Sequence, residues 1–170
     1  MPDGAWTRYK LQRKIFAIGE DLWIENDRGE LVFKVDGKAL SIREKFILED
    51  QGGGELLSVE TKLIAIQPTM KIERQGKLYA TVTMALFPIM PQHYTIQVDG
   101  GPTYEAEGDI TNHEYEVVSN GAPVAHISRR WYSIRDAYGV AVAPELDQAL
   151  MLAVAVCIDE ISERERDRNP

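Results

Sequence analysis

Apolar and polar residues alternate over short runs along most of the chain, and turn residues separate the runs. Four segments share one form, a strand-like run followed by a polar tip with glycine and a second run: 23–35, 46–59, 71–82 and 115–127. Tips such as Asp-Arg-Gly, Gln-Gly and Asn-Gly supply the positive backbone dihedrals that short hairpin loops require. The pattern therefore predicts a series of antiparallel β-hairpins.

Further alternating runs extend this meander to about a dozen short strands. They lie at Tyr9–Ile18, Leu40–Ile42, Leu63–Ile66, 78–84, 94–98, Tyr104–Ile110 and Trp131–Val142. Closure into a barrel or sandwich removes the exposed edges of such a sheet. Because no linker or low-complexity tract interrupts the pattern, we expect a single domain over residues 1–170, with a core at about 8–162 and a polar, fraying tail at 163–170.

After Pro144 the hydrophobic period changes from strand-like to helical. Ten consecutive apolar residues occupy 149–158, while Glu145 and Asp147 precede them and favour the positive end of a helix dipole. A helix that is apolar on every side must be surrounded by protein. Since a membrane span needs about 20 apolar residues, the pattern predicts a buried helix at Glu145–Ile161 and no transmembrane segment.

The composition is that of one soluble globular domain, with 170 residues, 44% hydrophobic and 27% charged. The single cysteine, Cys157, cannot form an internal disulfide and falls within the apolar helix, so we expect it to pack in the core. Residues 1–19 lack the pattern of a secretory signal, and the expected location is therefore cytoplasmic.

Charge is distributed unevenly along the sequence. The formal net charge is −8, from 19 basic and 27 acidic residues, and this sign argues against binding to nucleic acid. Residues 78–128 contain no Lys or Arg and hold six carboxylates. Solvation explains such a surface, and a cationic or protein partner is the alternative explanation.

Three motifs lead to a family resemblance. They are residues 24–50, with the Asp-Arg-Gly hairpin followed by Leu-Ser-Ile-Arg-Glu-Lys and Leu-Glu-Asp, then Gly108–Val117, and then Arg135–Val140 before the helix. On these motifs the chain resembles the LURP-one-related family of the tubby C-terminal-like superfamily, to which phospholipid scramblases are more distantly similar. The resemblance implies a mainly β fold: a tubby-like closed antiparallel barrel of about 12 strands around a central hydrophobic C-terminal helix. A fold does not fix an activity.

The residues that could carry chemistry form no catalytic or metal-binding motif. The histidines are His93, His113 and His126, and no His-x-His, His-x-x-x-His or Cys-x-x-Cys pair occurs. Neither a Gly-x-Ser-x-Gly elbow nor a phosphate-binding loop is present. We therefore expect no enzymatic activity, no catalytic residue, no metal and no cofactor.

Scramblases suggest one further metal hypothesis, because the segment before their helix is a proposed calcium loop. In this chain Tyr138, Val140 and Val142 stand where such a loop needs oxygen ligands. The sequence therefore favours a simple turn at Asp136 over a calcium site.

Two basic clusters are candidate binding sites for an anionic lipid. The first consists of Arg8, Lys10, Arg13 and Lys14. In the second, Arg129 and Arg130 adjoin Trp131 and Tyr132, and a basic pair beside interfacial aromatic residues suits a lipid headgroup. Tubby-type domains bind phosphoinositides, so the resemblance favours the same ligand class. We take Arg129, Arg130 and Trp131 as the candidate ligand-binding residues.

These observations favour a non-catalytic cytosolic barrel module that binds a lipid, a hydrophobic ligand or a protein partner. The first alternative is a structural or stress-associated protein-interaction domain with no small ligand. The second is an enzyme with a cleft at one end of the barrel. A monomer is the default oligomeric state.

Overall fold

A computed structural model describes residues 5–16, 19–36, 45–61, 66–85, 92–109, 114–132 and 136–168. Within these residues, twelve strands precede one long helix. The elements are β1 (Thr7–Phe16), β2 (Gly19–Glu25), β3 (Leu31–Asp36), β4 (Lys45–Asp50), β5 (Glu55–Thr61), β6 (Thr69–Arg74), β7 (Lys77–Met84), β8 (Gln92–Val98), β9 (Thr103–Asp109), β10 (Glu114–Ser119), β11 (Ala122–Ser128), β12 (Ala137–Val142) and α2 (Gln148–Arg168).

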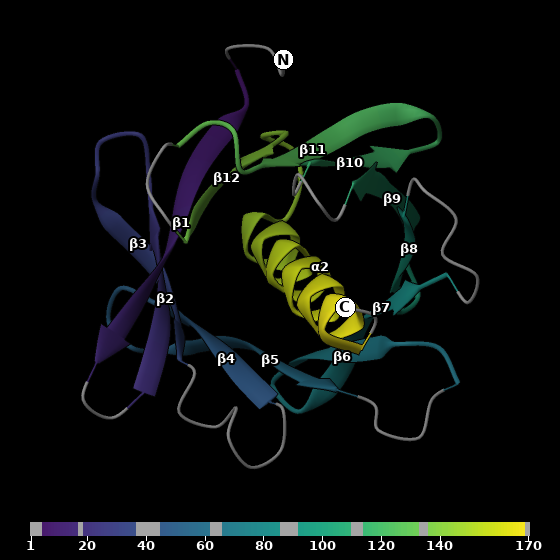
Figure 1. The fold of residues 1–170 in the computed structure, drawn as a ribbon, viewed down its shortest axis with the longest axis horizontal. Helices are drawn as coiled ribbons and strands as arrows, with labels where there is room; N and C mark the ends of the chain where they lie inside the picture. Colours follow the sequence, from purple (N-terminus) through teal and green to yellow (C-terminus); the bar gives the residue numbers. More distant parts are fainter. Residues whose placement is uncertain are drawn as a thin grey trace.

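The strands form a closed antiparallel barrel. Each strand pairs with its neighbour in sequence, and β12 closes the barrel by pairing with β1, where Tyr9 lies opposite Val140. Figure 1 looks along the barrel and shows α2 at its centre. The predicted fold is therefore confirmed. The strand predicted at Leu40–Ile42 lies outside the described residues, as does the one at Leu63–Ile66 except for Ile66, which is in a bend.

Alternation along the strands builds the core. In β8 every second residue is buried, and Tyr94 and Ile96 are fully buried within the core that also contains α2. Inward apolar residues on all strands face the helix, while the outward residues are mostly polar. β12 is the exception, because all six of its residues are buried. Its outer face must therefore be covered as well as its inner face.

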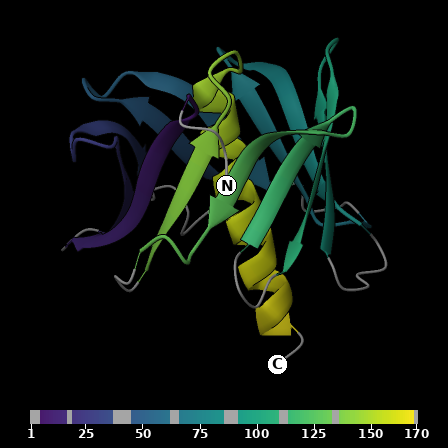
Figure 2. The ribbon, with the colours of Figure 1, turned by 90° about the horizontal axis from the view of Figure 1, so that it is seen from above.

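The helix α2 fills the barrel. Residues 150–158 are all at most 4% exposed, as expected for a helix that is apolar on every side. Figure 2 shows α2 passing through the barrel, with the last turns of the helix extending beyond the strands. The interior is thus occupied by the protein's own side chains.

The start of α2 differs from the prediction by three residues. Asp147 lies outside the helix and caps it, because its Oδ1 accepts a hydrogen bond from the Leu150 backbone N–H at 3.1 Å. Arg74 and the Tyr79 hydroxyl each donate to Asp147 Oδ2 at 2.6 Å. Burial alone would raise the pKa of Asp147, but these hydrogen bonds lower it. The cap therefore fastens the helix to β6 and β7.

The end of α2 also differs from the prediction. The helix was expected to end at Ile161 and the tail at 163–170 to fray, but α2 continues to Arg168. Contacts to the barrel stabilise these turns: Arg164 donates to Thr61 Oγ1 at 2.9 Å, and Glu163 pairs with Arg13 at 3.2 Å. Both contacts link residues far apart in sequence, so the local pattern gave no sign of them.

A polar network holds the C-terminal half of α2 inside the barrel. Arg13 turns inward from β1 and contacts carboxylate oxygens of Asp159 at 2.9 Å and Glu163 at 3.2 Å. On the opposite side, Ser162 Oγ hydrogen-bonds the hydroxyls of Tyr94 at 2.6 Å and Tyr115 at 2.9 Å. These groups satisfy one another where water is largely excluded.

The buried thiol gives a direct test of the helix position. Cys157 is 0% exposed, and burial raises its pKa, which disfavours the reactive thiolate. We expect a thiol reagent to label the native protein only slowly and the unfolded protein within its mixing time. Rapid labelling of the native protein would place α2 at the periphery.

Candidate functional site

Trp131 and Tyr132 cover the outer face of β12. The sequence predicted a strand over Trp131–Val142, but β12 begins only at Ala137, so this prediction is wrong at its start. Both rings pack on Gly139, where a Cβ would overlap the Trp131 ring and approach Tyr132 Cε2 to 3.1 Å. The missing side chain at Gly139 makes room for the two rings and explains why β12 is buried on both faces.

Trp131 lies between a cation and an imidazole. Arg8 on β1 and His126 on β11 pair with the same residue of β12, Ala141, from its two sides. The Arg8 guanidinium carbon is 5.2 Å from the Trp131 ring centroid. The His126 ring stacks on Trp131 with centroids 5.5 Å apart and an interplanar angle of 26°. These contacts hold the Trp131 ring in place on the outside of β12.

Two more cation–π pairs continue this arrangement along β1. Lys10 Nζ is 5.6 Å from the Tyr132 ring centroid, and Lys14 Nζ is 5.5 Å from that of Trp23. Alternate residues of β1 therefore place a row of cations on the outside of the barrel. We call this surface the basic–aromatic face, which consists of Arg8, Lys10, Lys14, Arg129, Arg130, Trp23, Trp131 and Tyr132.

The structure joins most of the two basic clusters predicted from the sequence. Arg8 and Lys10 of the first cluster contact Trp131 and Tyr132 of the second. Arg13 does not belong to this face, because it points inward to the carboxylates of α2. Closure of the barrel between β1 and β12 brings the clusters together.

Glu114 anchors the turn that carries Arg129 and Arg130. Its carboxylate accepts a hydrogen bond from the Ser128 hydroxyl and lies 3.1 Å from His126 Nε2. The Ser128 hydroxyl oxygen in turn accepts from the Arg130 backbone N–H at 3.1 Å.

The Arg130 side chain is 73% exposed, with Nε 3.7 Å from Glu114. Arg129 is half-buried. Ligand binding by Arg129, Arg130 and Trp131 stays a prediction.

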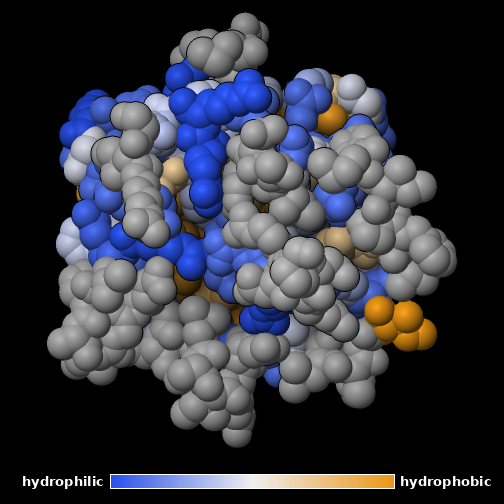
Figure 3. Space-filling view, viewed as in Figure 1, coloured by the Kyte–Doolittle hydropathy of each residue, from blue (hydrophilic) through white to orange (hydrophobic). Residues whose placement is uncertain are grey.

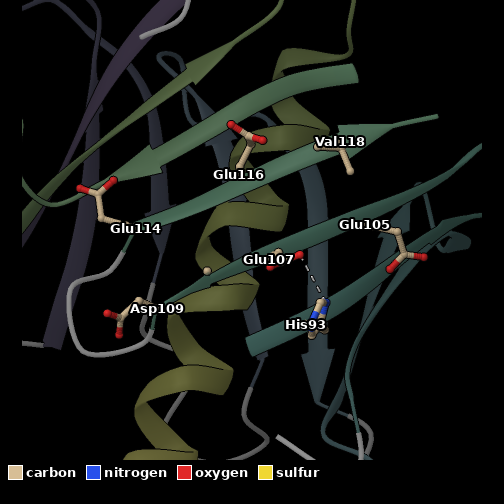
Figure 4. Close-up of a pocket in the computed structure, with 8 residues that line it drawn as sticks. His93, Glu105, Glu107, Asp109, Glu114, Glu116 and Val118 are labelled. Carbon is tan, nitrogen blue, oxygen red and sulfur yellow. Dashed lines mark ion pairs between the residues drawn. The ribbon is translucent and has the colours of Figure 1, made fainter. Parts of the chain in front are cut away.

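A second surface feature is a groove of about 520 Å³ on the outside of β8, β9 and β10. Figure 4 shows the carboxylates that line it. Its lining residues are His93, Glu105, Glu107, Gly108, Asp109, Glu114, Glu116 and Val118. We call it the acidic groove. It holds most of the negative charge that the sequence concentrates in residues 78–128.

Like charges lie directly opposite one another in the acidic groove. Glu107 pairs with Glu116, and Asp109 pairs with Glu114, across β9 and β10. The basic side chain among the lining residues is His93, whose Nδ1 lies 3.9 Å from the Glu107 carboxylate. Cross-strand like charges are unfavourable, and this surface repels anions.

The described residues offer no group of three or more His, Cys, Asp or Glu side chains that could hold a metal ion. The positions compared with a calcium loop, Tyr138, Val140 and Val142, are buried in β12. Asp136 stands in a turn with φ of 59°, and its carbonyl accepts a hydrogen bond from the Arg13 backbone N–H at 3.1 Å. His113 lies outside the described residues.

Gly139 gives a prediction about the basic–aromatic face. We expect Gly139→Ala to displace Trp131 and Tyr132, lowering the free energy of unfolding by about 1–3 kcal/mol, as for other overpacked sites. Denaturant unfolding followed by tryptophan fluorescence measures this. Gly52→Ala is the control, because a Cβ there meets only ordinary contact with Asp50. Equal stability of the two variants would contradict the packing.

The geometry defines the protein as a closed antiparallel β-barrel filled by its own C-terminal helix. The LURP-one-related family model matches residues 7–159, and the chain belongs to this family. The chain is also similar to a protein from Arabidopsis thaliana, solved by X-ray crystallography, at 18% sequence identity over 90% of each chain, with a TM-score of 0.66. At this identity the likeness shows the fold alone.

A search among curated proteins finds no match to the chain. In the part of the chain that the structure describes, no helix has the length and apolar character needed to cross a membrane.

Proposed function

We propose that the protein is a non-catalytic binding module that docks on an anionic membrane surface through its basic–aromatic face. One observation carries this proposal. Two basic clusters far apart in the sequence meet on one side of the barrel, at the contacts of Arg8 with Trp131 and of Lys10 with Tyr132. Cations held against aromatic rings suit phosphate-bearing headgroups.

The filled interior supports binding on the outside. Residues 150–158 occupy the space in which a barrel would otherwise hold a hydrophobic ligand. Figure 3 shows a mostly hydrophilic surface where the residues are described. Among the described residues, the large apolar side chains that stand exposed are Ile66 and Leu78. A charged face therefore explains recognition better than an apolar patch does.

The charge distribution supports one orientation at the membrane. The acidic groove on β8–β10 is repelled by anionic lipids, whereas β1 and the 129–132 turn are attracted. Anionic lipids are enriched in the cytoplasmic leaflet, which agrees with the expected cytoplasmic location. Binding of this kind is weakened by salt, because exposed charges are screened.

The potential nucleophiles and bases support a non-catalytic role. Cys157 is fully buried inside α2. His93 and His126 each face a glutamate, Glu107 and Glu114. Among the described residues, the side-chain partners of His93 and His126 are therefore carboxylates and not a serine or cysteine of the kind that a histidine activates as a nucleophile.

A protein-interaction domain with no small ligand is the second candidate function. The opposed carboxylates of the acidic groove favour it, because a cationic segment of a partner would relieve their repulsion. Lipid binding and its loss in charge variants distinguish the two candidates.

Reversal of two charges tests the proposal. Each basic residue near an anionic membrane contributes about 1 kcal/mol, so we expect Arg129→Glu with Arg130→Glu to abolish co-sedimentation with phosphoinositide-containing vesicles at low salt. Arg130→Glu alone, at an exposed position, should weaken it measurably. Lys71→Glu with Lys77→Glu, on β6 and β7 across the barrel, changes the net charge equally and should retain binding. Failure of the unaltered protein to bind would refute the proposal and favour the protein-interaction domain.

A further inference from the structure

We infer that His126 makes docking of the basic–aromatic face dependent on pH, so that proton uptake by this imidazole strengthens binding to anionic lipid. The inference rests on the proposed function, since it concerns regulation of the same face. Histidine is the side chain whose charge ordinarily changes between pH 5 and 8, and it serves as a switch in many proteins. His126 is the described histidine that contacts this face.

His126 contacts both the Glu114 carboxylate and the aromatic ring that Arg8 covers. One side of its ring stacks on Trp131, the residue that Arg8 also contacts. Its Nε2 lies 3.1 Å from the Glu114 carboxylate, which also lies 3.7 Å from Arg130 Nε. A single carboxylate thus lies against both the imidazole and the most exposed cation of the turn.

The charged groups around His126 come from each neighbouring element. On β10, Glu114 contacts the ring and Glu116 is the cross-strand partner of His126. On β12 the partner is Ala141, which has no charge. The 129–132 turn contributes Arg130 through Glu114, and β1 contributes Arg8 through Trp131. Carboxylates are therefore the charged groups nearest to the ring, while the cations lie one contact further away.

Protonation of His126 has two effects on this face. It adds one positive charge beside Trp131, on the side of the docking surface that borders β10. It also gives the Glu114 carboxylate a cationic partner in His126. Glu114 then attracts the Arg130 guanidinium less strongly, and Arg130 is available to bind a phosphate group. Both effects favour an anionic surface at lower pH. By linkage, docking on such a surface promotes proton uptake by the protein.

Vesicle binding at two pH values tests the inference. The probe is vesicles of neutral lipid with added phosphatidylserine, whose charge is the same at pH 5.5 and pH 7.5, at low salt. One added charge predicts about fivefold tighter binding at the lower pH for the unaltered protein. His126→Gln keeps a neutral donor near Glu114 and should remove this difference. His93→Gln, in the acidic groove, is the matched control and should retain it.

A second variant tests the inference independently, in case His126→Gln does not fold. His126→Lys carries its charge at both pH values and should bind at pH 7.5 as tightly as the unaltered protein does at pH 5.5. The inference is overturned if the unaltered protein binds equally at both pH values, or if His126→Gln keeps the same pH ratio. Neither result affects the proposed function, which would instead be refuted if the unaltered protein did not bind at either pH.

Discussion

Replacing Ala153 with aspartate is expected to lower the free energy of unfolding by about 4 kcal/mol, which is enough to unfold many domains of this size. Ala153 is 0% exposed and lies in the middle of α2, surrounded by the barrel. A carboxylate there has no cationic partner and no water, and burying such a group is among the most destabilising single changes. Denaturant unfolding monitored by circular dichroism measures the loss.

The same chemical change at the surface provides the control. Ala122 is exposed at the start of β11, and Ala122→Asp should alter stability by less than about 0.5 kcal/mol. If Ala153→Asp is as stable as Ala122→Asp, the helix does not occupy the barrel interior.

Removing the guanidinium of Arg13 is expected to cost about 3 kcal/mol, in the range measured for buried ion pairs that lose one partner. Arg13 is 26% exposed and its main partner Asp159 only 8%, so water screens the pair weakly. Burial alone would lower the pKa of Arg13, but the carboxylates of Asp159, Glu163 and Glu160 raise it above its usual range. Arg13→Met keeps much of the apolar stem and deletes the charge.

An exposed ion pair provides the comparison for Arg13. Arg28 pairs with Glu30 at 3.8 Å in the β2–β3 hairpin, where both side chains are more than half exposed. Arg28→Met should cost less than about 1 kcal/mol, as surface pairs do. Chemical denaturation of both variants tests the difference. A similar small loss in the two would mean that Arg13 does not fasten α2 to β1.

Much of the fold follows from local patterns in the sequence. Alternating runs and glycine-containing tips predicted the meander, and the apolar run at 149–158 predicted a helix surrounded by protein, as it is inside the barrel. Element ends were less predictable. The extension of α2 to Arg168 depends on contacts such as Arg164 with Thr61, which no local signal reveals. The cap at Asp147 was recognisable, since aspartate before an apolar run is a common N-cap.

The candidate site shows a different limit. Alternation continues from Trp131 into β12, so the pattern could not reveal that Trp131 and Tyr132 fold back over Gly139. The convergence of the two basic clusters could have been found only in part. If a meander closes, its first and last strands pair, which places Arg8 opposite Ala141 on β12, but the contact of Arg8 with Trp131 also depends on the fold-back over Gly139. The negative charge of the acidic groove followed directly from residues 78–128, which lack Lys and Arg, whereas the groove itself was not predicted.

Hydrogen–deuterium exchange with and without phosphoinositide-containing vesicles tests most directly whether the basic–aromatic face is the docking surface. We expect vesicles to slow exchange in β1 and in the 129–132 turn, while the amides of β8–β10 and α2 keep their rates. Slowing confined to the acidic groove, or faster exchange in α2, would contradict docking through the basic–aromatic face of a filled barrel.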